Sequence, residues 1–191
     1  MTDQAQARGD AIARIAEIFE RRGAESYLGE AVTMSEHMLQ AAALALAEGA
    51  PDTLVAAALL HDIGYFTSEF GGYSPADTID NRHDAAGAKA LAGAFPPAVT
   101  ECVRLHVAAK RYLCATDQAY HGKLSAVSKR SLALQGGPMS AAEAADFRRQ
   151  RYYREAVRVR VWDDRGKVAG LRTPSFADFR PLLQRVVDQR R

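Results

Sequence analysis

The sequence predicts an all-helical protein. Apolar residues recur at helical spacing in most segments, helix start and stop signals are frequent, and strand-type alternation is sparse. The chain has 191 residues, of which 48% are hydrophobic and 25% charged, so it has the size and composition of a globular domain with a packed core. No repeat, low-complexity tract or linker interrupts it, and we expect one domain over residues 1–191.

The N-terminal third should hold three helices. Apolar residues at helical spacing predict the first, over roughly residues 4–21. Thr33 and Glu36 have the spacing of a capping box, so a second helix should begin there. A third helix should begin with Asp52 as its N-cap and end at Gly64.

The rest of the chain continues the helical pattern. Glycine, proline and aromatic residues predict a loop over residues 65–80. Pro96-Pro97 suits the first turn of a helix, where a missing amide proton does no harm. Other helices are expected near residues 82–92, 125–134, 141–149, 151–165 and 175–189.

Composition narrows the classes of partner and compartment. The net charge of +2 is too small to indicate nucleic-acid binding, and most arginines of the run over residues 148–160 are expected on a solvated helix face. Cys102 and Cys114 lack CxxC spacing, which argues against a disulfide framework. Because the sequence shows neither a signal peptide nor an apolar run of ~20 residues, we expect a cytoplasmic protein with no membrane partner. The oligomeric state is left open.

Four of the five histidines follow a regular spacing. His37, His61, His83 and His106 lie 24, 22 and 23 residues apart, each on or at the end of a different predicted helix. Adjacent antiparallel helices can present such side chains to one central pocket, as helical bundles do when they bind metals. His121 falls outside the pattern and is expected in a surface loop.

Two aspartates complete a possible metal site. Asp62 directly follows His61 and could bridge two ions, because a carboxylate has two oxygens. Asp163 or its neighbour Asp164 would add a terminal carboxylate. The helical period favours Asp163, whose face also carries basic residues three positions before and four after it. The set predicts a two-metal cluster around His61-Asp62.

The ordered set of expected ligands resembles that of the HD-domain superfamily of metal-dependent phosphohydrolases; the set is His37, His61-Asp62, His83, His106 and Asp163. The histidines beyond the His-Asp pair resemble those of the dinuclear members of this superfamily. Further motifs are Tyr27-Leu28-Gly29-Glu30 and the segments 105–113, 135–140 and 160–164. Together they are similar to the HD-domain mixed-valent diiron oxygenases that cleave the C–P bond of 1-hydroxyphosphonates. The resemblance implies an all-α helical bundle, an Fe(II)/Fe(III) pair, O2 as co-substrate, and release of phosphate with an amino-acid-like carboxylate.

The resemblance also implies which residues hold each ion. One iron would be held by His37, His61, Asp62 and Asp163, and the other by Asp62, His83 and His106. Asp62 would bridge them. Histidine and carboxylate ligands would also accept manganese or zinc, so the metal in the cell stays open.

Residues near the substrate are implied in the same way. Tyr27 resembles the family tyrosine that occupies an iron position until substrate displaces it, and Glu30 the partner that meets the substrate ammonium. Where the family often has a histidine after His-Asp-Ile-Gly, this chain has Tyr65-Phe66. Because aromatic faces attract quaternary ammonium groups, we hypothesise a 1-hydroxy-2-(trimethylammonio)ethylphosphonate substrate that gives glycine betaine. The primary-amine form, which gives glycine, is the close rival.

Basic and hydroxyl side chains should bind the phosphonate. Lys110 and Arg160 each lie about one helical turn from an expected ligand, so they would clamp the dianion from opposite walls. Ser128 and Ser131, three residues apart on one helix face, could donate to the same oxygens.

Two other classes of function fit parts of the sequence. An HD-type phosphohydrolase would use the metals to activate water against a phosphoester. A non-catalytic nucleotide-binding module is disfavoured by the intact set of ligands.

Overall fold

A computed structural model describes residues 2–67 and 78–189, and in these residues the protein is helical, with a single isolated bridge between Ser26 and Thr33. The prediction of an all-helical fold is confirmed. The helices are α1 (Thr2–Arg22), α2 (Met34–Ala47), α3 (Asp52–Leu60), the 3-10 helix η1 (Ile63–Phe66), α4 (His83–Leu91), α5 (Pro97–Thr116), α6 (Gln118–Lys123), α7 (Ala126–Leu134), α8 (Ala141–Arg148), α9 (Tyr153–Arg165) and α10 (Phe176–Asp188). None of these helices is long and apolar enough to cross a bilayer.

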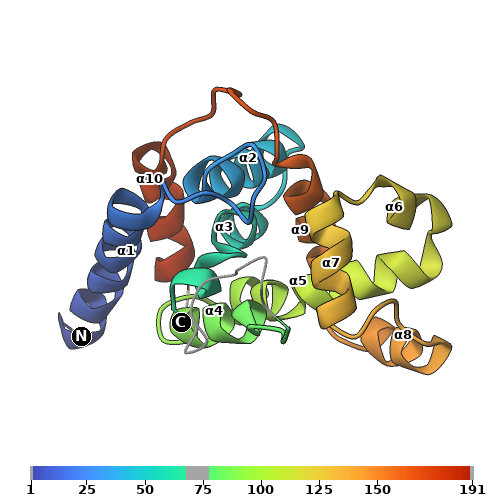
Figure 1. Ribbon diagram of the computed structural model, residues 1–191. Coiled ribbons are helices and arrows are strands. Elements are labelled where there is room, and N and C mark those ends of the chain that lie inside the picture. The colour runs from blue at the N-terminus through green and yellow to red at the C-terminus, as the bar shows by residue number, and fades with distance from the viewer. Residues whose placement is uncertain (1, 68–77, 190–191) are drawn as a thin grey trace.

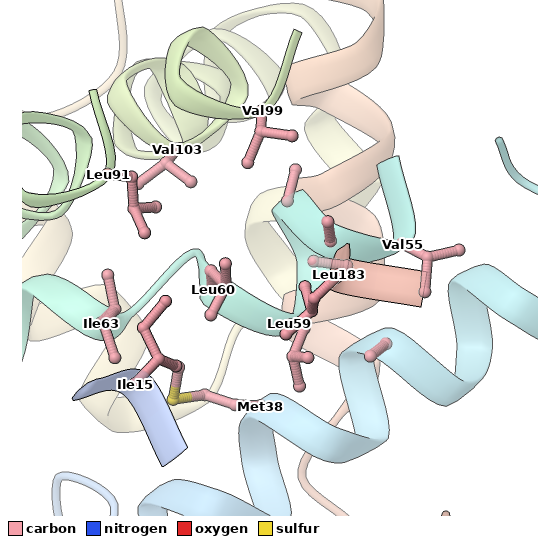
Figure 2. Close-up of a cluster of buried hydrophobic side chains, with 14 of the residues drawn as sticks. Ile15, Met38, Val55, Leu59, Leu60, Ile63, Leu91, Val99, Val103 and Leu183 are labelled. Carbon is pink, nitrogen blue, oxygen red and sulfur yellow. The ribbon is translucent and has the colours of Figure 1, made fainter. Parts of the chain in front are cut away.

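Helix α3 forms the centre of the core. Every residue from Leu54 to Leu60 is buried, and α2, α5, α9 and α10 pack around this helix. Leu59 and Leu60 lie among apolar side chains from α1, α2, α5 and α10 (Figure 2). Figure 1 shows α1 beside α10 at one end of the molecule, and α6, α7 and α8 at the other. A helix that is apolar all round is expected in such a central position.

Of two predicted helix caps, the structure confirms that of α2 and contradicts that of α3. Thr33 accepts a hydrogen bond from the amide of Glu36, whose carboxylate accepts one from the amide of Thr33, so the predicted capping box is present. The prediction of Asp52 as an N-cap is wrong. Pro51 occupies the cap position, and the Asp52 carboxylate instead accepts a hydrogen bond from Arg185 of α10 at 2.9 Å.

Gly64 serves close packing and does not end a helix as predicted. Helix α3 already ends at Leu60, and Gly64 lies inside η1. A Cβ atom on Gly64 would lie 1.7 Å from the carbonyl oxygen of His83, so only glycine permits this contact. The contact brings the first residue of α4 against the turn that follows α3.

Two predicted loops are partly helical. Tyr65 and Phe66 belong to η1, and most of the remaining predicted loop, residues 68–77, lies outside the described residues. His121 lies in the short helix α6, because Asp117 caps this helix through the amides of its first turn. His121 is exposed, as predicted.

The Gly64 contact predicts a large effect of one added methyl group. We expect Gly64→Ala to lower the free energy of unfolding by about 2 kcal/mol, because the backbone of His83 must move away. Denaturant unfolding followed by circular dichroism measures this change. The control is Gly122→Ala in α6, where nothing lies within 4 Å of an added Cβ. Equal stability of the two variants would contradict the prediction.

Candidate metal centre

The structure brings together all six residues that the sequence singled out as metal ligands. Five helices or helix ends contribute them, and each residue is at most 3% exposed. They are His37 from α2, His61 and Asp62 from the end of α3, His83 from the start of α4, His106 from α5 and Asp163 from α9. Asp164, the competing carboxylate, lies outside this cluster and bonds to Arg160 and Tyr120.

Asp62 lies between two pairs of histidines. Its Oδ2 is 3.5 Å from Nε2 of His37 and 3.4 Å from Nε2 of His61. Its Oδ1 is 3.3 Å from Nε2 of His83 and 3.4 Å from Nε2 of His106. Five of the six side chains therefore form two groups suited to a metal ion, and the two groups share Asp62. The sixth, Asp163, lies 3.5 Å from Nε2 of His37 and 3.7 Å from Nε2 of His61.

The ring nitrogens of the histidines face one another in a way that calls for a cation. The Nδ1 atoms of His37, His61 and His106 lie 2.8, 2.8 and 2.7 Å from backbone carbonyl oxygens, which only accept hydrogen bonds. Nδ1 of His83 lies 3.0 Å from the side-chain oxygen of Asn81. The proton of each neutral ring therefore sits on Nδ1, and Nε2 carries a lone pair. Yet Nε2 of His37 is 3.0 Å from that of His61, and Nε2 of His83 is 3.1 Å from that of His106. A metal ion beside each pair would remove the repulsion between these lone pairs.

The carboxylates of Asp62 and Asp163 also indicate that the cluster binds a cation. Asp62 Oδ2 and Asp163 Oδ1 are buried and have no hydrogen-bond partner among the described residues. A buried charged oxygen without a partner is costly, and a cation would satisfy both oxygens. Burial lowers the pKa of His61, but Asp62 and Asp163 more than offset this and raise it to about 9. In the absence of metal, a proton on His61 can thus supply part of the positive charge that the carboxylates need. Imidazole and carboxylate without thiolate suit iron, manganese or zinc.

Two tyrosines cover the histidines on the pocket side. The ring of Tyr27 stacks on His37 with a centroid distance of 3.8 Å, and the ring of Tyr65 stacks on His83 at 4.1 Å. Burial, Asp62 and Asp163 raise the pKa of both phenols well above the usual value, so both stay protonated.

A strained turn holds Tyr27 and Glu30 at the pocket. Leu28 and Gly29 have φ values of 54° and 87°, and the Glu30 amide donates to the Tyr27 carbonyl at 2.7 Å. A positive φ at a leucine is uncommon and has a cost in free energy, which packing of Leu28 against the core offsets. The turn thereby fixes the backbone of both motif residues.

A pocket with an empty volume of about 340 Å³, its opening included, lies against the metal centre. All seven residues expected to meet the substrate line it: Tyr27, Glu30, Tyr65, Lys110, Ser128, Ser131 and Arg160. Asp62, His83, His106 and Asp163 form its floor. Phe66 is not in the lining and instead lies under the guanidinium of Arg22.

The two expected basic residues differ in how they are paired. Arg160 contacts Asp163 at 2.7 Å and also bonds to Asp164, so its charge is already balanced. Lys110 is 3% exposed and donates to the hydroxyl of Ser131 at 2.9 Å. Burial, and then Arg160, lower the pKa of Lys110 to about 7. Lys110 is therefore the better placed of the two to neutralise an incoming anion.

Sequence reasoning did not assign two of the polar residues in the pocket lining. Lys167 lies 3.1 Å from the hydroxyl of Ser128 and 5.8 Å from the centre of the Tyr27 ring. Its helical spacing from Asp163 was a signal for this position. Gln135 also lines the pocket, and its Oε1 is buried with no hydrogen-bond partner in the described part of the chain. Gln135 begins the motif segment 135–140, which was its signal in the sequence.

Comparison with known proteins agrees with this geometry. Residues 34–142 match the model of the HD domain family. The chain is 52% identical, over 182 residues, to the [1-hydroxy-2-(trimethylamino)ethyl]phosphonate dioxygenase (glycine-betaine-forming) of Leisingera caerulea. The aligned residues cover 95% of this chain and 93% of that protein. It is 42% identical to a hydroxymethylphosphonate dioxygenase of Gimesia maris, over 90% of this chain and 85% of that protein. The chain belongs to the HD domain family and is an enzyme related to its phosphonate dioxygenases.

Proposed function

We propose that this protein uses O2 and a pair of iron ions to cleave the C–P bond of [1-hydroxy-2-(trimethylammonio)ethyl]phosphonate, with glycine betaine and phosphate as products. The observation that carries the proposal is the pair of histidine groups joined by Asp62, of which Asp62, His83 and His106 line a pocket that also holds basic and acidic side chains. The 52% identity to the glycine-betaine-forming dioxygenase supports the choice of substrate. The reaction balances, because both oxygen atoms of O2 appear in the products, one in the carboxylate and one in phosphate.

Each of the two groups of ligands would hold one metal ion. His37, His61, Asp62 and Asp163 would hold one ion, and Asp62, His83 and His106 the other. When bound, an Fe(II)/Fe(III) pair supplies the redox chemistry toward O2. The hydrogen bonds from each Nδ1 fix the orientation of the rings, and Arg160 fixes Asp163.

The basic wall of the pocket suits the phosphonate end of the substrate. Lys110 and Lys167 each donate to a serine hydroxyl of α7, and Lys167 also forms a long ion pair with Asp164 at 3.9 Å. Both ammonium groups can turn toward phosphonate oxygens, and the hydroxyl of Ser128 lies beside them. Arg160 adds positive potential but stays bonded to its two aspartates.

Other residues of the pocket lining suit a quaternary ammonium group. Glu30 supplies a carboxylate, and the rings of Tyr27 and Tyr65 supply aromatic surface. Hydroxymethylphosphonate has no nitrogen and would leave Glu30 without a cationic partner. Tyr27, which covers His37, is the residue that we expect to give way when the substrate binds.

The reaction itself is tested by measuring phosphate release from iron-loaded protein with and without O2. We expect release of phosphate from the trimethylammonio substrate only with O2, with one O2 consumed per phosphate, and slower release from the primary-amine form. The HD-type phosphohydrolase makes the opposite prediction. Phosphate release from a phosphoester without O2 would reject the oxygenase function, and a clear preference for the primary amine would reject the methylated substrate.

Loss of the shared carboxylate should affect both metal groups. We expect Asp62→Ala to remove most of the bound iron and to lower turnover at least a hundredfold, because each histidine pair loses its common anionic partner. Iron per chain is measured by mass spectrometry, and turnover by phosphate release. His121→Ala, in the exposed helix α6, is the matched control and should keep both. An Asp62→Ala protein that retains its iron would contradict the assignment.

Lys110 predicts a pH dependence of substrate binding. Its pKa is lowered to about 7, so the ammonium form that attracts a phosphonate is present below this pH and is lost as the pH rises through it. We therefore expect KM to increase between about pH 7 and pH 9. In Lys110→Arg the charge persists at all these pH values, and the increase should disappear. The same pH profile in both proteins would show that another group is responsible.

A further inference from the structure

Ser125, directly before α7, bonds to Glu30, an acidic residue of the pocket lining. Its Oγ donates to Oε1 of Glu30 at 2.6 Å, although the two residues are 95 positions apart in the chain. Glu30 lines the pocket, whereas Ser125 lies behind it and is not part of the lining. The contact therefore acts on Glu30 and not on a ligand directly.

The hydroxyl of Ser125 has a second bond that fixes its direction. It accepts a hydrogen bond from the amide of Ser128 at 3.1 Å, as the N-cap of α7. A hydroxyl has one proton, so with its lone pair turned to the helix amide the proton points to Glu30. The turn over residues 27–30 already fixes the backbone of Glu30. Ser125 thus fixes the side-chain carboxylate of Glu30 as well.

We propose that Ser125 is a positioning residue that adapts Glu30 to a quaternary ammonium ion, an inference that rests on the proposed function. A primary ammonium donates up to three hydrogen bonds, and it can satisfy a carboxylate by itself. A trimethylammonium group has no N–H and offers only its charge. A partly buried carboxylate that faces such a ligand must receive its hydrogen bonds from the protein, and Ser125 supplies one of them.

The prediction is a selective loss of affinity on removal of this hydroxyl. Ser125→Gly keeps a good N-cap residue and removes the donor, whereas Ser125→Thr keeps both. The ligands are 2-(trimethylammonio)ethylphosphonate and 2-aminoethylphosphonate, titrated by calorimetry into the iron-loaded protein without O2. We expect Ser125→Gly to weaken binding of the trimethylammonio ligand about tenfold, and that of the amino ligand about twofold. Ser125→Thr should bind both like the unchanged protein.

A matched control separates this effect from the loss of a helix cap. Ser140 caps α8 in a capping box and is absent from the pocket lining, so Ser140→Gly should leave both affinities unchanged. Equal weakening of the two ligands by Ser125→Gly, unchanged binding of both, or no binding of either ligand by the unchanged protein would overturn the proposal. The proposed reaction can fail separately, because absence of O2-dependent turnover would leave this ratio of affinities intact.

Discussion

The position of the Asp62 carboxylate between two pairs of histidines is the constraint on which the rest of the structure depends. Each of its oxygens faces one pair, and within each pair the Nε2 atoms lie 3.0 or 3.1 Å apart. Such closeness of basic nitrogens and unsatisfied oxygens is stable only with positive charge among them. The cluster therefore has the properties of a metal centre.

The fold places this carboxylate by ending its most buried helix next to it. Helix α3 is covered on all sides, so the residues after Leu60 have little freedom. Gly64 then lets the chain touch the backbone of His83, which brings α4 and its histidine to the far side of Asp62. Core packing and metal geometry are thus coupled, and a change in one is expected to disturb the other.

Much of this arrangement could be predicted from the sequence because it depends on local periodicity. Regular spacing of four histidines on separate helices, and the face that Asp163 shares with basic residues, indicated the cluster that the structure contains. Long-range pairing could not be predicted. No local pattern shows that Tyr120 bonds to Asp164 or that Ser125 bonds to Glu30. Helix ends were misplaced where a tertiary contact, such as that of Asp52 with Arg185, used the side chain.

Side chains of both charges line the pocket. Lys110, Lys167 and Glu30 line one pocket together with part of the metal centre, and this combination of charges suits a zwitterion. The central claim is that Asp62 bridges two ions. A crystal structure of the iron-loaded protein, with anomalous data at the iron edge, tests it most directly. We expect two peaks, one on each side of Asp62, whereas a single peak, or peaks that do not contact Asp62, would show that Asp62 is not shared by two ions.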